Sequence, residues 1–259
     1  MLVSLSSMAC TAPEVAVSAP TLAGTTQNST PTVLPRPEVR RTPDQSPVRR
    51  QAGVGAPAVM IPGVPSVPPA WIDPYEVTVR RFKACVDAHA CRPEQFTVEA
   101  GSMCNYGEPS RSEHPMNCVS WHGANAFCRF AGGRLCRESE WFAACRGPQQ
   151  RNYPYGSQYQ EGACRARIRA IDNSPPQGTA PVGETSGCEG GYPGLTDMVG
   201  NVAEWVDSCD GDYCHFYGGA FLDSQPIEAF ASCQRFCAGN QKTFRSITIG
   251  LRCCYDVAP

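Results

Sequence analysis

Apolar residues recur at intervals of three and four positions in several stretches of the chain, a spacing typical of amphipathic helices. One such stretch covers residues 77–89, where the apolar positions are Val79, Phe82, Cys85 and Val86. Residues 121–131 show the same pattern, and residues 138–145 show it over a shorter length. The sequence therefore predicts helices over these three ranges.

Residues that start and stop helices flank the second of these stretches. Ser120 is placed to cap its first turn, and Gly132-Gly133 is placed to end it. Beyond residue 145, Gly and Pro recur every few positions and periodic runs disappear. Such a chain is expected to make short strands joined by irregular loops. Few helices, short strands and many loops indicate an α+β fold.

The N-terminal part of the chain differs in composition from the rest. Residues 11–70 hold twelve of the 24 prolines and no aromatic residue, so they cannot bury enough apolar surface to offset the entropy of ordering. We therefore predict a disordered Pro-rich linker over 11–57 and one domain over 58–259. The linker is locally basic, which suits either a solvated tether or contact with an acidic surface. The arginines concerned are Arg36, Arg40, Arg41, Arg49 and Arg50.

The chain as a whole carries little net charge. Its formal value is -2 at pH 7, so there is no global case for nucleic-acid binding. No segment approaches the 18 or so consecutive apolar residues of a transmembrane helix.

Sixteen cysteines are too many for a reduced cytosolic protein, and no paired C-x-x-C framework for zinc accompanies them. Disulfides and an oxidising compartment are the economical interpretation. Residues 1–10 form a short apolar run that ends in Ser7-Met8-Ala9-Cys10, a degraded form of the bacterial lipoprotein cleavage box. We interpret them as a signal remnant with a lipid anchor at Cys10. Fifteen cysteines then remain, an odd number.

The stretch Asp197–Trp205 reads D-x-x-G-N-V-x-E-W. Side-chain oxygens stand near both ends, and a glycine allows a sharp turn between them. Calcium takes six to eight oxygen ligands from carboxylates and backbone carbonyls, so the stretch is a candidate calcium loop. The alternative is a tight turn in which Trp205 is an ordinary core residue.

Six motifs in order along the chain resemble those of the formylglycine-generating enzyme (sulfatase-modifying factor) family. They are W-I-D-P-Y-E-V-T at 71–78, H-P-M-N-C-V-S-W at 114–121, G-G-R-L-C-R-E-S-E-W at 132–141, G-T-A-P-V-G at 178–183, the calcium-loop candidate at 197–205 and I-G-L-R-C at 249–253. The resemblance implies a C-type-lectin-like variant of the α+β class. Together with the cysteines it suggests a bacterial protein that is secreted or lipid-anchored to the envelope.

The resemblance also implies two long-range disulfides, Cys128–Cys253 and Cys145–Cys237. Short separations in the sequence suggest four more, which are Cys85–Cys91, Cys104–Cys118, Cys164–Cys188 and Cys209–Cys214. Cys136–Cys254 completes the set as a conjecture, and it leaves Cys233 unpaired.

The family's calcium ligands carry over onto the candidate loop. They are the side chains of Asp197 and Glu204 and the backbone carbonyls of Gly200 and Val202. The family's second calcium segment corresponds to residues 163–168, which lack its asparagine. Only the first site is therefore expected.

The catalytic motif of the family is altered. Its enzymes oxidise a sulfatase cysteine to formylglycine with oxygen and a copper ion held by two thiolates, which are soft ligands suited to Cu(I). Those cysteines follow an R-G-G-S motif, and the matching residues 217–223 read Y-G-G-A-F-L-D. Ala220 stands at the serine and Asp223 at the first copper cysteine, while Cys233 is the nearest candidate for the second.

These departures predict a calcium-supported, disulfide-stapled binding or scaffold module without formylglycine-generating activity, with a protein or glycan as its ligand. The alternative is a metal-dependent oxidoreductase of the family's type, in which Cys233 and a neighbour bind copper at a rearranged site. A third hypothesis places iron on Asp223 and His215.

One aromatic cluster near the altered motif could serve as a binding surface. It comprises Tyr213, His215, Phe216 and Tyr217. The alternative is local packing around a Cys209–Cys214 disulfide.

Overall fold

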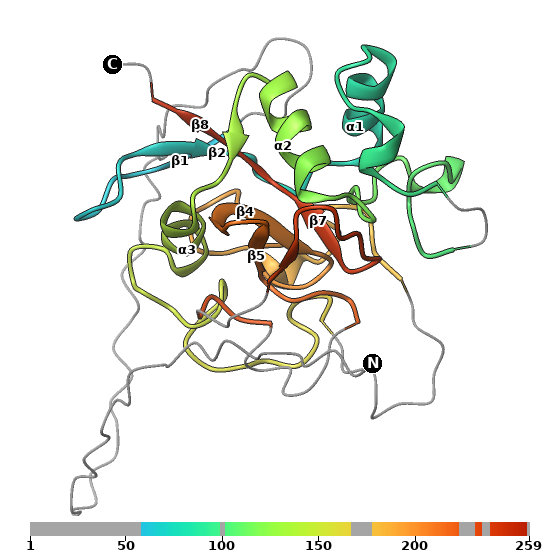
Figure 1. The fold of residues 1–259 in the computed structure, drawn as a ribbon. Helices are drawn as coiled ribbons and strands as arrows, with labels where there is room; N and C mark the ends of the chain where they lie inside the picture. Colours follow the sequence, from blue (N-terminus) through green and yellow to red (C-terminus); the bar gives the residue numbers. More distant parts are fainter. Residues whose placement is uncertain (1–57, 99–101, 167–177, 223–230, 235–238, 258–259) are drawn as a thin grey trace, which may run out of the picture. The chain divides into compact units, whose positions relative to one another are not determined.

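The computed structural model describes residues 58–98, 102–166, 178–222, 231–234 and 239–257. Within them, three α-helices and eight short strands alternate with long loops (Figure 1). The helices are α1 (Val79–Asp87), α2 (Trp121–Phe130) and α3 (Glu138–Arg146). The strands are β1 (Val59–Ile61), β2 (Ala70–Ile72), β3 (Arg134–Leu135), β4 (Ala203–Asp210), β5 (Tyr213–Tyr217), β6 (Gly239–Gln241), β7 (Ile249–Leu251) and β8 (Cys253–Asp256). The α+β prediction is confirmed.

The strands form two four-stranded sheets, in the orders β1-β2-β8-β3 and β6-β5-β4-β7. The first sheet is antiparallel throughout, whereas β4 and β7 of the second run parallel, with Ala203 opposite Ile249. Only Arg252 separates β7 from β8, so this one residue carries the chain from the second sheet to the first. Any group that holds Arg252 therefore holds both sheets.

Polar caps fix the predicted helices. The Thr78 Oγ1 accepts a hydrogen bond from the backbone N–H of Arg81 at the start of α1, and the Ser120 Oγ accepts one from Gly123 N–H at the start of α2. α2 ends at Phe130, just before Gly132, whose φ of 80° lies in the left-handed region. All three predicted helices are confirmed to within a few residues.

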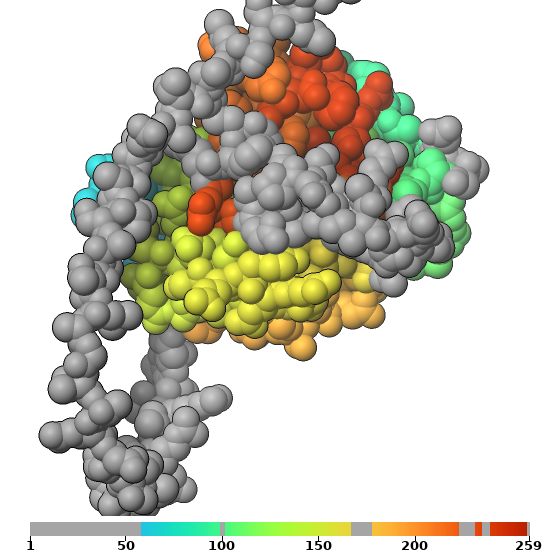
Figure 2. Space-filling model, turned by 90° about the horizontal axis from the view of Figure 1, so that it is seen from below, coloured from blue at the N-terminus to red at the C-terminus, as the bar shows by residue number. Residues whose placement is uncertain are grey.

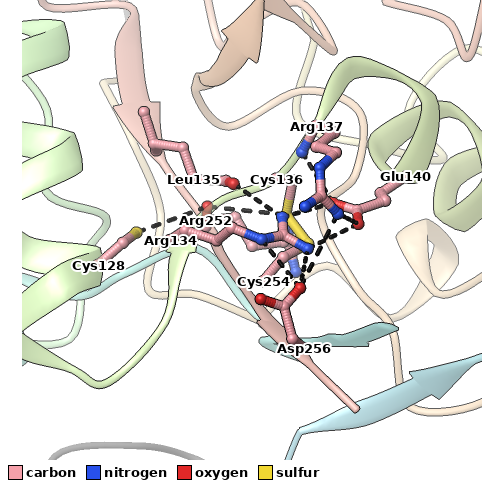
Figure 3. Close-up of polar contacts among 9 residues, drawn as sticks. All are labelled: Cys128, Arg134, Leu135, Cys136, Arg137, Glu140, Arg252, Cys254 and Asp256. Carbon is pink, nitrogen blue, oxygen red and sulfur yellow. Dashed lines mark hydrogen bonds and ion pairs between the residues drawn. A yellow bond between two sulfur atoms is a disulfide. The ribbon is translucent and has the colours of Figure 1, made fainter. Parts of the chain in front are cut away.

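An ion-pair network attaches the start of α3 to the first sheet (Figure 3). Arg134 of β3 reaches both carboxylate oxygens of Glu140 at 2.7 Å and Asp256 of β8 at 2.6 Å. The backbone N–H and the guanidinium of Arg137 also donate to Glu140, each at 2.8 Å. Glu140 is only 2% exposed, so its charge needs compensation within the protein. The two guanidinium groups supply it.

The core consists of two clusters. The first lies around α1 and α2, where the rings of Phe82 and Phe127 stack with their centroids 5.6 Å apart. The second surrounds α3, which lies against β4, and contains Trp141 and Met198. The loops after α3 (yellow) and after residue 178 (gold) lie side by side on the face shown in Figure 2.

Seven disulfides tie these loops and sheets together, and they include all 14 cysteines that the structure describes. Four close short loops, namely Cys85–Cys91, Cys104–Cys118, Cys164–Cys188 and Cys209–Cys214. Two long-range bridges, Cys128–Cys253 and Cys136–Cys254, pin β8 to the region of α2 and β3. These six pairings coincide with those expected from the sequence.

The expected Cys145–Cys237 bridge is wrong, because the structure joins Cys145 to Cys233. The backbone of Cys233 is held at the end of α3, since its N–H donates to Asn152 O at 2.7 Å and its carbonyl accepts from Arg146 Nε at 2.8 Å. Cys233 is thus not the unpaired cysteine. Cys10 and Cys237 lie outside the described residues.

Tryptic digestion under non-reducing conditions should test this pairing. Cleavage after Arg235 separates Cys233 from Cys237, and the peptide 138–146 contains Cys145 alone. We expect mass spectrometry to find peptide 138–146 bridged to peptide 170–235, which is also joined through Cys188 to the peptide that contains Cys164. Recovery of 138–146 bridged to peptide 236–242 would contradict the structure.

Candidate functional site

The turn before β4 depends on residues with left-handed backbone angles. Asp197, Gly200 and Asn201 have φ values of 58°, 80° and 53°. A side chain at Gly200 would place its Cβ 2.8 Å from the backbone of Arg165, so only glycine fits there. The Asp197 carboxylate lies inside the turn, 3% exposed, and accepts a 2.6 Å hydrogen bond from Gly183 N–H.

Glu204, in β4, is bound on both carboxylate oxygens. Its Oε1 accepts from Arg252 Nε at 2.9 Å and lies 2.8 Å from Arg252 Nη2. Its Oε2 accepts from Trp141 Nε1 at 2.7 Å. Both charged side chains are almost completely buried, so the pair is an internal ion pair of the core.

Glu76 is a third buried carboxylate at this site, and the sequence analysis did not single it out. Its Oε2 accepts from Asn201 Nδ2 at 2.7 Å, and its Oε1 accepts from Val202 N–H at 2.9 Å. Glu76 is fully buried. Its place in the motif at 71–78 was the only available signal, because these partners lie more than 120 residues further along the chain.

Three buried carboxyl groups lie near the guanidinium of Arg252 at this site. Burial raises the pKa of Asp197 to about 6, and nearby Glu204 adds to this, while the Gly183 N–H and Arg252 oppose it. Burial also raises the pKa of Glu76 well above its usual range, helped by Asp197 and Glu204. Arg252 is thus the guanidinium that faces three carboxylates, and an additional cation would relieve their repulsion.

The fit to calcium is therefore mixed. Carboxylate and carbonyl oxygens are the right kind of ligand, and the excess negative charge suits a divalent cation. However, the described side chains include no group of three or more His, Cys, Asp or Glu residues placed to hold a metal ion. Calcium binding by Asp197, Gly200, Val202 and Glu204 remains a prediction.

The residues at the altered catalytic motif are packed into the core. Tyr217 is 4% exposed and its hydroxyl donates a hydrogen bond to Glu138, while Ala220 is fully buried. The sulfur of Cys233 is bonded to that of Cys145, so it offers no thiolate to copper. Asp223 lies outside the described residues. In this arrangement Cys233 does not fit the role of a copper ligand.

Three of the aromatic residues of β5 are in ring contact, since His215 lies 6.2 Å from both Tyr213 and Tyr217 between ring centroids, but most of this cluster is covered. Tyr217 packs between Trp141 and Phe142, and Phe216 meets the Trp205 ring edge-on at 5.3 Å. Tyr213 is the exposed member, at 48%. His215 lies beside Ser208, with 3.3 Å between Nδ1 and the hydroxyl oxygen. The structure thus favours local packing over a shared binding surface.

The fold and the turn before β4 define a sulfatase-modifying-factor type of domain. A model of the sulfatase-modifying factor enzyme 1-like domain matches residues 59–257, and the chain belongs to this family.

Individual proteins similar to this chain point to the same family. A mouse formylglycine-generating enzyme is 43% identical over 105 residues, or 37% of this chain and 27% of the enzyme. A bovine inactive Cα-formylglycine-generating enzyme 2 is 32% identical over 160 residues, or 57% of this chain and 52% of that protein. The solved structure of PvdO from Pseudomonas aeruginosa shares the fold, with a TM-score of 0.55 and 20% identity over 83% of this chain and 89% of that one.

The Glu204–Arg252 pair should be essential to stability. Glu204→Gln leaves a buried guanidinium without its counter-charge, so we expect a loss of about 3–5 kcal/mol in the free energy of unfolding. Denaturant titration in the presence of a chelator would measure this without a contribution from metal. Glu113→Gln is the matched control, because Glu113 pairs with Arg80 at the surface, and its loss should stay below about 1 kcal/mol. Equal losses in the two variants would refute the role given to the buried pair.

Proposed function

We propose that this protein is a binding or scaffold module that keeps the family fold without formylglycine-generating activity. The observation that carries the proposal is the Cys145–Cys233 disulfide. A copper site of the family type needs free thiolates, and every cysteine within the described ranges is already bonded to another.

Two further observations support the proposal. Ala220, at the position of the family's serine, has no hydroxyl and is buried. Tyr217, at the position of the arginine, is held in the core by Glu138 and offers no positive charge. The name of the bovine relative, an inactive member of the family, is consistent with a scaffold that persists without the chemistry.

The disulfides place the domain in an oxidising, extracytoplasmic environment. None of the helices in the described part of the chain is long and apolar enough to cross a membrane. Attachment through a lipid at Cys10 would hold the domain at the envelope, and Cys10 lies outside the described residues.

We assign a structural calcium ion to the turn before β4 as part of this proposal. Its supports are the carboxyl groups of Asp197 and Glu76, whose pKa values are raised mainly by burial and further by the neighbouring carboxylates. The ion would bring positive charge to loops that have little regular structure of their own. It would supply stability and no chemistry.

Chelation should therefore lower the melting temperature of the protein. We expect a difference of about 5–10 °C between calcium in hundredfold excess over its Kd and excess EDTA. Asp197→Ala should abolish this difference because it removes a ligand. Asp207→Ala, which removes an exposed carboxylate from β4, should preserve it. A wild-type melting temperature that is the same in both buffers would argue against the calcium site.

The proposed lack of formylglycine-generating activity can be tested directly. The copper-loaded protein would be incubated in oxygenated buffer with a C-x-P-x-R peptide of the sulfatase type, and mass spectrometry would follow the cysteine. We expect no formylglycine, while the mouse enzyme under the same conditions converts the peptide. Conversion by this chain would overturn the proposal and show that another cysteine pair holds the metal.

A further inference from the structure

A pocket of 480 Å³ opens where α3 ends. None of its lining residues belongs to the altered catalytic motif at 217–223. One wall comes from residues 148–151, which follow α3, and the other from residues 186–193. These segments belong to the loops that adjoin on the face shown in Figure 2. The polar side chains that line the pocket are Gln149, Arg151, Ser186, Glu189 and Tyr192. Its volume lies within the usual range of small-molecule sites.

The floor of the pocket is fixed by close backbone packing. A Cβ added at Gly190 would lie 2.0 Å from Pro154 O, and one at Gly191 would lie 2.0 Å from Ala144 O. The chain can approach α3 and the loop after it this closely only because both residues are glycines. The Gly191 N–H also donates to Pro154 O at 3.2 Å.

The walls are held by covalent and polar contacts. The Cys164–Cys188 disulfide anchors the segment that carries Glu189. Arg151 Nη1 donates to Pro154 O at 3.0 Å, and Glu189 Oε1 accepts from Gly194 N–H at 2.8 Å. A ligand would therefore meet a largely preformed site, which lowers the entropic cost of binding.

The pocket has unused hydrogen-bonding capacity of both kinds. Within the part of the chain that the structure describes, the Gln149 amide and the hydroxyls of Ser186 and Tyr192 make no hydrogen bond. Arg151 has further N–H donors, and Glu189 has a second carboxylate oxygen. The ring of Tyr192, which is partly buried, lines the pocket together with these donors and acceptors.

These features select a class of ligand. A charged ligand would be attracted by one of Arg151 and Glu189 and repelled by the other, so the site favours a neutral one. An apolar ligand would cover the polar side chains without satisfying them, at a cost in free energy. A neutral sugar offers hydroxyls that pair with planar amide, carboxylate and guanidinium groups, and C–H bonds that pack on an aromatic face.

We propose that this pocket binds a neutral saccharide unit, one or two rings in size, with the ring of Tyr192 as its stacking surface. The proposal deepens the binding function proposed above and rests on it. The Tyr192 side chain packs against the sugar ring, while Gln149, Arg151 and Glu189 bond its hydroxyls.

Ligand-detected NMR would test the proposal with the full chain. The probes would be glucose, galactose, mannose and N-acetylglucosamine with their β-linked disaccharides, and glucuronate would serve as a charged comparison. We expect at least one neutral sugar to bind. The Tyr192→Ala substitution should lower the affinity for this sugar about tenfold or more. Tyr192→Phe keeps the aromatic ring and should lower the affinity for the sugar by less. Tyr213→Ala, which removes an exposed tyrosine on β5, should bind as the wild type does. Circular dichroism would establish that all three variants are folded.

Three results would overturn the saccharide site. They are no binding by any neutral sugar, binding that Tyr192→Ala leaves intact, and tighter binding of glucuronate than of the neutral sugars. Each is distinguishable from failure of the proposed function, because formylglycine production is measured in a separate assay. If the protein neither binds sugar nor converts the peptide, the saccharide site is refuted and the proposed lack of formylglycine-generating activity stands.

Discussion

The rest of the structure depends on the buried guanidinium of Arg252. This residue joins β7 to β8, and its side chain binds Glu204 of β4, the carbonyl of Asp73 after β2, and the carbonyl of Thr196 in the turn before β4. One planar group with donors on several sides thus connects both sheets and the candidate calcium turn. Short strands and long loops supply few ladder hydrogen bonds, so the contacts of Arg252 are among the few polar links between the two sheets. The adjacent bridges Cys128–Cys253 and Cys136–Cys254 hold the same point covalently.

This arrangement explains why the site keeps its carboxylates although the catalytic motif is altered. Glu204 is needed to compensate Arg252, whether or not it also meets a cation. Glu76 is needed to hold Asn201 and the backbone of Val202, which give the turn its shape. The excess negative charge near Asp197 follows from placing these structural carboxylates together in a buried site. The carboxylates that would favour a cation are therefore the same ones that the architecture needs, and neither role depends on copper chemistry.

Much of the fold could be predicted from the sequence. The features that could not be predicted have identifiable physical causes. The helices follow from the spacing of residues such as Val79 and Phe82 and from the cap Ser120, all of which act locally. The fold follows from six motifs in order. The partner of Cys145 does not, because Cys233 and Cys237 lie four residues apart, and only the contacts of Cys233 with Asn152 and Arg146 separate them. The role of Glu76 and the pocket beside Tyr192 depend on residues that are distant in sequence.

The distribution of disulfides bears on where a binding function can reside. Loops usually carry function at the expense of order, and a loop-built site normally loses affinity to the entropy of ordering. Here Cys164–Cys188 anchors one wall of the pocket, and Cys145, which is bridged to Cys233, lies in the helix that precedes the other wall. The bridge that removes a thiolate from copper chemistry therefore also steadies the end of α3, next to the pocket. One covalent bond thus bears on both proposals, because it withholds a thiolate from copper and steadies the helix beside the proposed binding pocket.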